Sequence, residues 1–147
     1  MHPELSYKEF NTAEFVKQTL KNIGLTDVYS IGGTGVITTI YAKHHSKKDK
    51  CIAFRADLDA LPIQELNNVK YKSQHEGVMH ACGHDVHTSI LLGLAEVLFS
   101  FKDLLPQPVK LIFQPGEEVN PGGANLIIDG GGLKNPEVSK IFALHVF

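Results

Sequence analysis

Hydrophobic residues recur along the chain in two patterns, which predict an amphipathic helix near the start and several short strands after it. Between residues 7 and 23 the apolar positions fall on one broad helical face. The expected apolar stripe consists of Phe10, Phe15, Val16, Leu20 and Ile23. Ser6 and Glu9 have the spacing of a capping box at the start of this helix, and Gly24 is a natural stop at its end.

Runs of β-branched and apolar residues predict the strands, and a second apolar stretch predicts a largely buried helix. The expected strands are residues 28–31, 35–42, 51–56, 109–113 and 141–146, and the expected later helices are residues 85–101 and 123–129. Asp85 would serve as N-cap or first-turn acid of the buried helix. Helices that alternate with apolar strands predict an α/β layered fold, with a mainly parallel or mixed sheet and helices on both faces.

We expect different roles for two of the connecting segments. Residues 44–50 contain Lys47, Lys48 and Lys50, and we expect them to form a solvated, charged turn. The irregular stretch that follows Pro62 and runs to about residue 81 is unusually long for a compact domain. Its length indicates a functional role.

Composition and charge exclude several classes of protein. Of the 147 residues, 43% are hydrophobic and 20% charged, which is typical of a soluble globular domain. The net charge of −2 gives no reason to expect nucleic acid or an anionic membrane as partner. The chain shows neither a long apolar run nor the pattern of a signal peptide. Cys51 and Cys82 are too few for a disulfide framework, so a reducing cytosol is the expected compartment.

Four polar groups interrupt the apolar pattern, three after predicted strands and one just before the buried helix. They are Asp57 with Asp59, Cys82 with His84, Glu117 with Glu118, and His145. In extended chain, residues two apart share a face, so the two aspartates would point the same way. A thiolate and an imidazole suit zinc or a similar transition metal. Because ligands bind at the carboxyl edge of open α/β sheets, the four groups together predict a site there.

Each group also has an ordinary structural interpretation. The two aspartates could be turn residues, and Cys82 could be a small buried apolar residue. Either histidine could be an ordinary hydrogen-bonded side chain, and the two glutamates could belong to a solvated loop. The glycines of residues 122–123 and 130–132 are better explained as turn residues than as a phosphate loop, because the Gly-Lys-Ser/Thr signature is missing.

In order along the chain, five segments resemble the M20 metallopeptidase family. The resemblance is to its amidohydrolase branch, which contains aminoacylase-like, hippurate-hydrolase-like and N-acetyldiaminopimelate-deacetylase-like enzymes. The matching segments are HPELSYKEF, FRADLDALPIQE, MHACGHDVHTS, FQPGEEVNPGGA and IFALHV. They extend over residues 2–146, almost the whole chain.

The resemblance implies a role for each polar group. The implied metal ligands are Cys82, His84, Glu118 and His145. Glu117 would be the general base, and Asp57 or Asp59 would orient the ligand shell, with no basis for choosing between the two. The resemblance further implies a two-metal centre of zinc or manganese. Metal-activated water would then hydrolyse the amide bond of a small N-acyl amino acid.

Family members are about two and a half times longer, which exceeds the usual size of a single domain. The resemblance therefore implies that residues 1–147 are the N-terminal portion of a catalytic domain. A dimerisation and lid domain, and the C-terminal part of the catalytic domain with a further histidine ligand, would be absent. We expect the full-length protein to be a homodimer. The fragment itself would bind metal weakly, have little activity and associate through exposed apolar surface.

Two other functions remain open from the sequence. In a cysteine hydrolase, Cys82 would be the nucleophile and His84 or His87 its base, but the two glutamates would then have no role. Alternatively, the chain could be a non-catalytic metal-binding domain or a scaffold.

Overall fold

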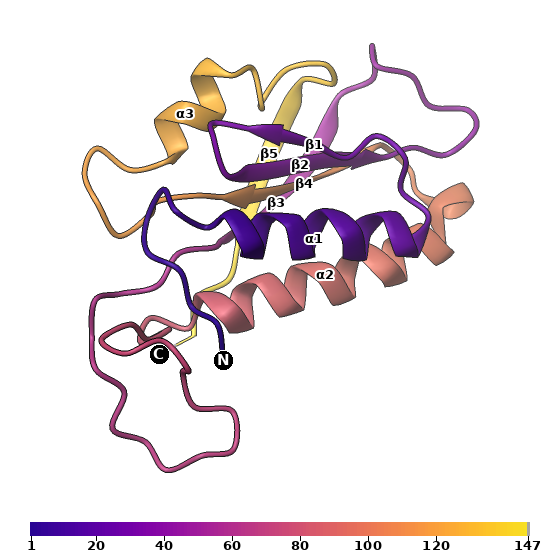
Figure 1. The fold of residues 1–147 in the computed structure, drawn as a ribbon. Coiled ribbons are helices and arrows are strands. Elements are labelled where there is room, and N and C mark those ends of the chain that lie inside the picture. Colours follow the sequence, from indigo (N-terminus) through magenta and orange to yellow (C-terminus); the bar gives the residue numbers. More distant parts are fainter. Residues whose placement is uncertain (147) are drawn as a thin grey trace.

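A single mixed sheet of five strands forms the centre of the molecule, as the computed structural model shows for residues 1–146 (Figure 1). The strands are β1 (Tyr29–Ile31), β2 (Gly35–Ile40), β3 (Cys51–Asp57), β4 (Val109–Gln114) and β5 (Val138–Ala143). Their order across the sheet is β1-β2-β4-β3-β5. β2 pairs antiparallel with β1 and β4, whereas β3 pairs parallel with β4 and β5.

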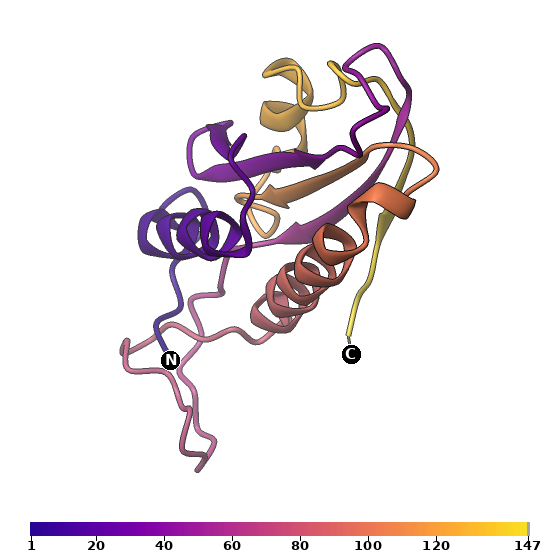
Figure 2. The same ribbon diagram turned by 90° about the vertical axis from the view of Figure 1, so that its right-hand side faces the viewer.

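Helices cover both faces of this sheet, as Figures 1 and 2 show. The helices are α1 (Phe10–Ile23), α2 (His84–Ser100), the 3-10 helix η1 (Lys102–Leu104) and α3 (Ala124–Asp129). α1 and α2 lie side by side on one face, and α3 lies on the other. The expected α/β fold with a mixed sheet is confirmed.

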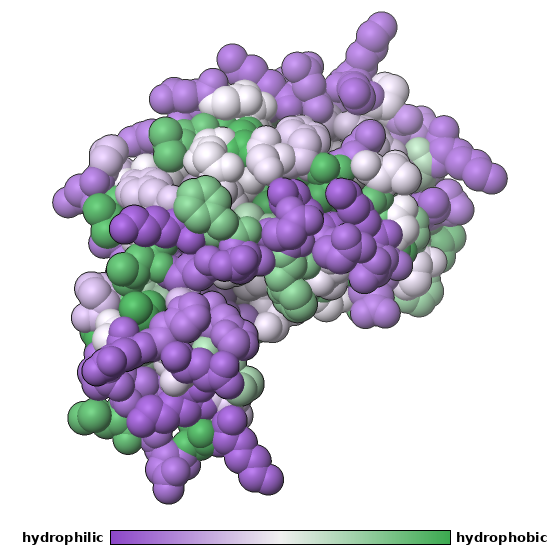
Figure 3. All heavy atoms as spheres, viewed as in Figure 1, coloured by the Kyte–Doolittle hydropathy of each residue, from purple (hydrophilic) through white to green (hydrophobic). Residues whose placement is uncertain are grey.

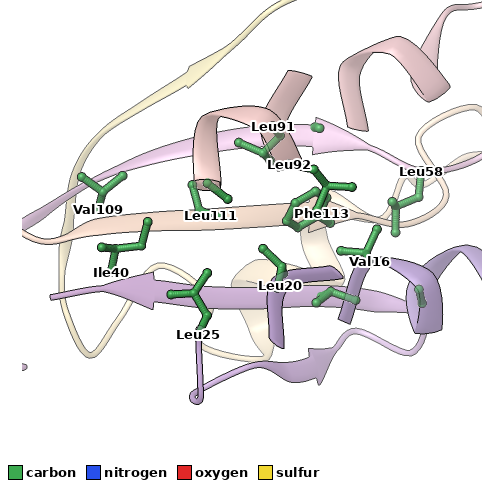
Figure 4. Packing of buried hydrophobic residues seen from close by; sticks show 14 residues of the cluster. Val16, Leu20, Leu25, Ile40, Leu58, Leu91, Leu92, Val109, Leu111 and Phe113 are labelled. Atoms are coloured by element: carbon green, nitrogen blue, oxygen red, sulfur yellow. The ribbon is translucent and has the colours of Figure 1, made fainter. Parts of the chain in front are cut away.

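The core has two parts because alternate residues of each strand face opposite sides of the sheet. On one side Leu111 and Phe113 of β4 pack with Leu20 of α1 and Leu91 of α2 (Figure 4). On the other side Ile112 belongs to a smaller cluster with Ile31, Ile37, Ala53 and Ile127. All six residues of β4 are buried, as expected of a central strand.

Lys110, the one charged residue of β4, is fully buried beneath the chain that follows α3. Its Nζ donates hydrogen bonds to the carbonyl oxygens of Gly132 at 3.0 Å, Lys134 at 2.8 Å and Pro136 at 3.0 Å. Burial lowers the pKa of Lys110. These bonds fasten the segment that leads into β5 to the middle of the sheet.

The predicted start of the first helix is wrong, because Ser6 and Glu9 do not form a capping box. α1 begins at Phe10, and Ser6 instead donates to Asp59 across the fold. Glu4 caps the helix: its carboxylate accepts from the backbone N–H of Asn11 at 3.2 Å and of Thr12 at 2.8 Å. These bonds lower the pKa of Glu4 against the opposing effect of burial.

Part of the predicted apolar stripe of α1 is also wrong. Phe10 and Phe15 are 67% and 63% exposed, whereas Ala13, Val16 and Leu20 are buried. The helix lies on the sheet and on α2 through a narrower face than its sequence suggests, so a small alanine occupies the contact and the two aromatic rings lie outside it.

The last strand lies earlier than predicted, at Val138–Ala143 instead of residues 141–146, because its pairing partners on β3 run from Cys51 to Arg55. It is an edge strand, and five of its six residues are exposed. Lys47, Lys48 and Lys50 are exposed, as expected of a solvated turn.

The long connection between β3 and α2 projects from the sheet and is mainly hydrophilic on the face that Figure 3 shows. In the described chain it contains only isolated bridges, such as Leu61 with Met79, and no helix or longer strand. Among residues 1–146, no helix combines the length and the hydropathy that crossing a membrane would need.

Replacing Lys110 with methionine tests its role in fastening the segment before β5. Methionine has a similar length but leaves three carbonyl oxygens without their donor, so we expect the free energy of unfolding to fall by about 2–4 kcal/mol. Urea denaturation measures the change, and Lys48→Met, at an exposed position, is the matched control. Equal stabilities of the two variants would show that the buried ammonium contributes nothing.

Candidate metal centre

The carboxyl ends of β3 and β4 and the chain that follows β5 meet at one edge of the sheet, beside the N-terminus of α2 (Figure 1). This meeting follows from the topology, because β3 is parallel to both of its neighbours. The polar groups singled out in the sequence come directly after these strands or at the start of α2. A hollow of about 520 Å³ opens at this edge, and Cys82 and His145 are among its lining residues.

His84, in the first turn of α2, lies at the centre of the site and is almost completely buried. Its Nδ1 lies 3.2 Å from Asp59 Oδ1. Since a carboxylate only accepts hydrogen bonds, Nδ1 carries a proton, and Nε2 is the nitrogen that can bind a metal when the ring is neutral. This nitrogen faces three acids: Nε2 lies 3.6 Å from Glu118 Oε1, 3.7 Å from Asp57 Oδ2 and 3.9 Å from Glu117 Oε2.

Side chains that could hold a metal fall into three overlapping groups, all of which include His84. The groups are Cys82 with His84 and His145, His84 with Glu117 and Glu118, and Asp57 with His84 and His87. Within each group the possible ligand atoms lie within 4.8 Å of one another. The structure therefore brings together all four residues that the sequence resemblance gave as ligands, and the implied base Glu117 with them.

The donor atoms fit a divalent metal ion. His84 Nε2 and Glu118 Oε1 are buried and form no hydrogen bond within the described residues, although buried polar atoms are nearly always paired. Cys82 Sγ and His145 Nε2 lie 3.4 Å apart beside them. Thiolate and imidazole favour zinc, whereas the carboxylates also suit manganese.

The electrostatics of the site favour a cation. Burial alone would raise the pKa of Asp59, but hydrogen bonds from His84, Ser6 and the backbone N–H of Glu118 lower it far below its usual range. Asp59 is therefore a carboxylate at neutral pH. Burial lowers the pKa of His84, but Asp59, Asp57 and Glu118 outweigh that effect and raise it.

Cys82 responds to the same negative surroundings. Burial, a hydrogen bond with Glu118 and the charges of Glu117 and Asp57 raise the pKa of its thiol to about 11. Without a cation the thiol is therefore protonated at neutral pH, which argues against Cys82 as an activated nucleophile. A bound metal would oppose this effect, because it favours the thiolate.

The two aspartates are bound differently. Asp59 contacts His84 directly and also accepts from Ser6 Oγ at 2.6 Å and from the backbone N–H of Glu118 at 3.0 Å. Asp57 accepts from Arg55 Nη1 and from His87 Nδ1, each at 2.6 Å. Both aspartates are buried, so neither is a solvated turn residue.

Three residues of this network were not assigned to a metal site from the sequence: Ser6, Arg55 and His87. His87 was considered only as a base for a cysteine nucleophile. Its Nε2 accepts from the backbone N–H of Val146 at 3.0 Å, so it links Asp57 to the segment that carries His145. The spacing of His84 and His87, three residues apart on one helix, was the available signal, because residues so spaced share a face.

Comparison with known proteins identifies a peptidase family and several longer relatives that resemble this chain. Residues 53–147 match the model of peptidase family M20/M25/M40. The chain is 44% identical to thermostable carboxypeptidase 1 of Saccharolobus solfataricus over 99% of its own length. It is 39% identical to the N-acyl-L-amino acid amidohydrolase of Geobacillus stearothermophilus over 93% of its length. In both cases it spans only 36% of the relative.

A solved structure has a similar fold. The crystal structure of the Bacillus subtilis YXEP protein, described as a dinuclear metal-binding peptidase, superposes with a TM-score of 0.89 at 38% sequence identity. The match covers 99% of this chain and 39% of that one.

Alkylation of Cys82 tests the electrostatics of the metal-free site. After treatment with a chelator, we expect the rate of carboxymethylation to rise with pH around a midpoint near 11, because only the thiolate reacts. Mass spectrometry locates the modified cysteine, and Cys82→Ser shows what the buried Cys51 contributes. Rapid alkylation below pH 8 would contradict a protonated thiol and would favour the cysteine nucleophile.

Proposed function

This chain belongs to peptidase family M20/M25/M40, and from that premise we propose that it is the metal-bearing part of an enzyme that hydrolyses N-acyl amino acids. One observation carries the proposal: the buried Nε2 of His84 and the buried Oε1 of Glu118 face each other at 3.6 Å, and neither forms a hydrogen bond within the described residues. The alternative of a scaffold without a metal leaves these two atoms unexplained.

The proposed substrate has an amide nitrogen that belongs to an amino acid with a free carboxylate. The names of the two curated relatives support this class, since a carboxypeptidase and an N-acyl-amino acid amidohydrolase both cleave such an amide. The acyl group could be acetyl, benzoyl or indole-acetyl. A small substrate of this kind suits the hollow of about 520 Å³ beside Cys82 and His145.

We propose that residues 1–147 are the N-terminal portion of the catalytic domain of a longer protein. A dimerisation and lid domain and the C-terminal part of the catalytic domain would lie in the rest, and the whole protein would be a homodimer. The share of 36% of each curated relative supports this division. The exposed outer side of β5 supports it too, because exposed apolar side chains such as Ile141 and Phe142 are typical of a surface that another segment covers.

The proposed ligands of two divalent ions, zinc or manganese, are Cys82, His84, Glu118 and His145. Bound metal would supply a water of low pKa and polarise the amide carbonyl. We place the protein in a reducing compartment such as the cytoplasm, because Cys82 can act as a ligand only if it does not form a disulfide.

Glu117 is the proposed general base. Its side chain is 42% exposed, so it can reach a substrate, and its Oε2 lies 3.9 Å from His84 Nε2. It would take the proton of the attacking water and deliver it to the leaving nitrogen. Asp59 is the proposed orienting acid, because it holds the Nδ1 proton of His84 and directs Nε2 towards the glutamates. Asp57 accepts hydrogen bonds from Arg55 and His87, and its Oδ2 lies 3.7 Å from His84 Nε2, where it adds negative charge beside the proposed ligand.

Replacing Glu117 with glutamine in the longer enzyme separates catalysis from metal binding. Glutamine keeps the shape of the side chain but cannot accept the proton, so we expect kcat to fall by about 10²–10⁴-fold with metal content unchanged. Turnover of N-acetyl amino acids and elemental analysis measure the two quantities. Glu96→Gln, at an exposed position of α2, is the matched control. Unchanged turnover would refute the role of base, and loss of metal would make Glu117 a ligand.

Removing the metal tests the reaction class. We expect a chelator to abolish hydrolysis by the longer enzyme and zinc or manganese to restore it, with N-acetyl, N-benzoyl and N-indole-acetyl amino acids as the substrate panel. Turnover that survives the chelator but is lost when Cys82 is alkylated would favour the cysteine hydrolase instead.

A further inference from the structure

The N-terminal segment HPELSYKEF, far in sequence from the glutamates, lies against the loop that carries them. We call residues 115–119, which follow β4, the base loop. Glu9 is fully buried although it precedes α1 and lies outside the sheet. Its Oε1 accepts from the backbone N–H of Gly116 at 2.8 Å and of Tyr7 at 2.9 Å, and its Oε2 accepts from Thr34 Oγ1. Hydrogen bonds to a buried carboxylate are stronger than neutral ones, so Glu9 is a firm anchor for Gly116.

Tyr7 holds the same loop at its other end. Its hydroxyl donates to the carbonyl oxygen of Val119 at 3.0 Å. Its ring lies so close to Gly116 that a Cβ there would come within 2.3 Å of it. Tyr7 itself has a φ of 64°, which is rare for a bulky residue and persists only where surrounding contacts enforce it.

Further bonds complete the attachment of the base loop. Asp59 Oδ2 accepts from the backbone N–H of Glu118 at 3.0 Å and from Ser6 Oγ at 2.6 Å. The carbonyl oxygen of Gly116 accepts from the N–H of Gly123 at 2.9 Å. Glu117 therefore lies between two amides, each bound to a different buried carboxylate, while its own side chain remains half-exposed.

We propose that Tyr7 and Glu9 are positioning residues that fix the base loop and thereby aim Glu117 at the substrate. The inference rests on the proposed function for the reaction that Glu117 serves, but the contacts themselves do not depend on it. Gly116 makes such an attachment necessary, since a glycine with a φ of 55° leaves the backbone before Glu117 free to take other conformations. A general base displaced by even about 1 Å loses much of its effect.

Hydrogen exchange on the chain itself tests the attachment without any assay of activity. In Glu9→Ala the Gly116 amide loses its acceptor, so we expect it to exchange at least about tenfold faster than in the parent chain. Glu9→Gln keeps an acceptor oxygen and should restore slow exchange. Glu65→Ala is the matched control, because that buried carboxylate holds the amide of Ser73 in a different loop. Unchanged exchange at Gly116 in Glu9→Ala overturns the proposal, as does the same acceleration in Glu65→Ala.

Steady-state kinetics of the longer enzyme test the consequence for the base. Tyr7→Phe removes one hydroxyl and keeps the ring against Gly116, so it should fold even where Glu9→Ala does not. We expect its kcat to fall about threefold to tenfold while KM and metal content stay unchanged. Tyr29→Phe on β1 makes the same chemical change away from the site and should be neutral.

Each kinetic outcome decides the proposal. A loss in kcat alone supports a positioning role. An unchanged kcat in Tyr7→Phe, or a fall that parallels a loss of metal, overturns it. If the longer enzyme hydrolyses none of the acyl amino acids with either metal, the proposed function fails. Hydrogen exchange at the Gly116 amide alone then decides whether Tyr7 and Glu9 fix the base loop.

Discussion

The hydrogen bond between His84 and Asp59 is the contact on which the arrangement of the site depends. Asp59 is a carboxylate at neutral pH, so it holds a proton of His84 on Nδ1 and leaves Nε2, which faces Glu118 and Glu117, as the nitrogen that can bind a metal. Asp59 also binds the backbone of Glu118 through its other oxygen. One buried side chain thus sets the tautomer of the histidine and the place of the acids that face it. Such outer contacts govern how a ligand meets a metal.

The sheet brings these residues together, although they are far apart in sequence. β4 is buried along its whole length and separates the two apolar clusters, while β3 runs parallel to it and ends at Asp57, level with Gln114. The residues that follow both strands therefore lie at the same edge of the sheet, beside the start of α2. The stability of the domain comes from the apolar contacts behind this edge, and so the edge can hold buried polar atoms without hydrogen-bond partners.

The sequence predicts helices and strands whose bounds depend on the local pattern of residues. Its predictions are wrong where contacts with distant residues determine the structure. α2 and β4 were placed to within a residue, because their apolar runs are long and clearly bounded. The capping box failed because Ser6 and Glu9 bond to Asp59 and Gly116, contacts that no local spacing reveals. β5 was misplaced because its register depends on β3. The seven candidate residues of the metal centre came from motifs, but the difference between Asp57 and Asp59 depends on how the chain turns after β3.

The two halves of the candidate metal centre differ in how firmly the described chain holds them. His84, Asp59 and the backbone of Glu118 are fixed by buried hydrogen bonds against the core. Cys82 is only half-buried and His145 is exposed, on a segment that follows an edge strand with little cover. The bond from the Val146 amide to His87 ties that segment to α2. A cation near Glu118 would thus meet ligands that the core holds, whereas one near His145 would meet a more exposed side chain that contacts Cys82 and His87. Holding an exposed side chain in one place costs conformational entropy, so we expect a cation to bind more weakly beside His145 than beside Glu118.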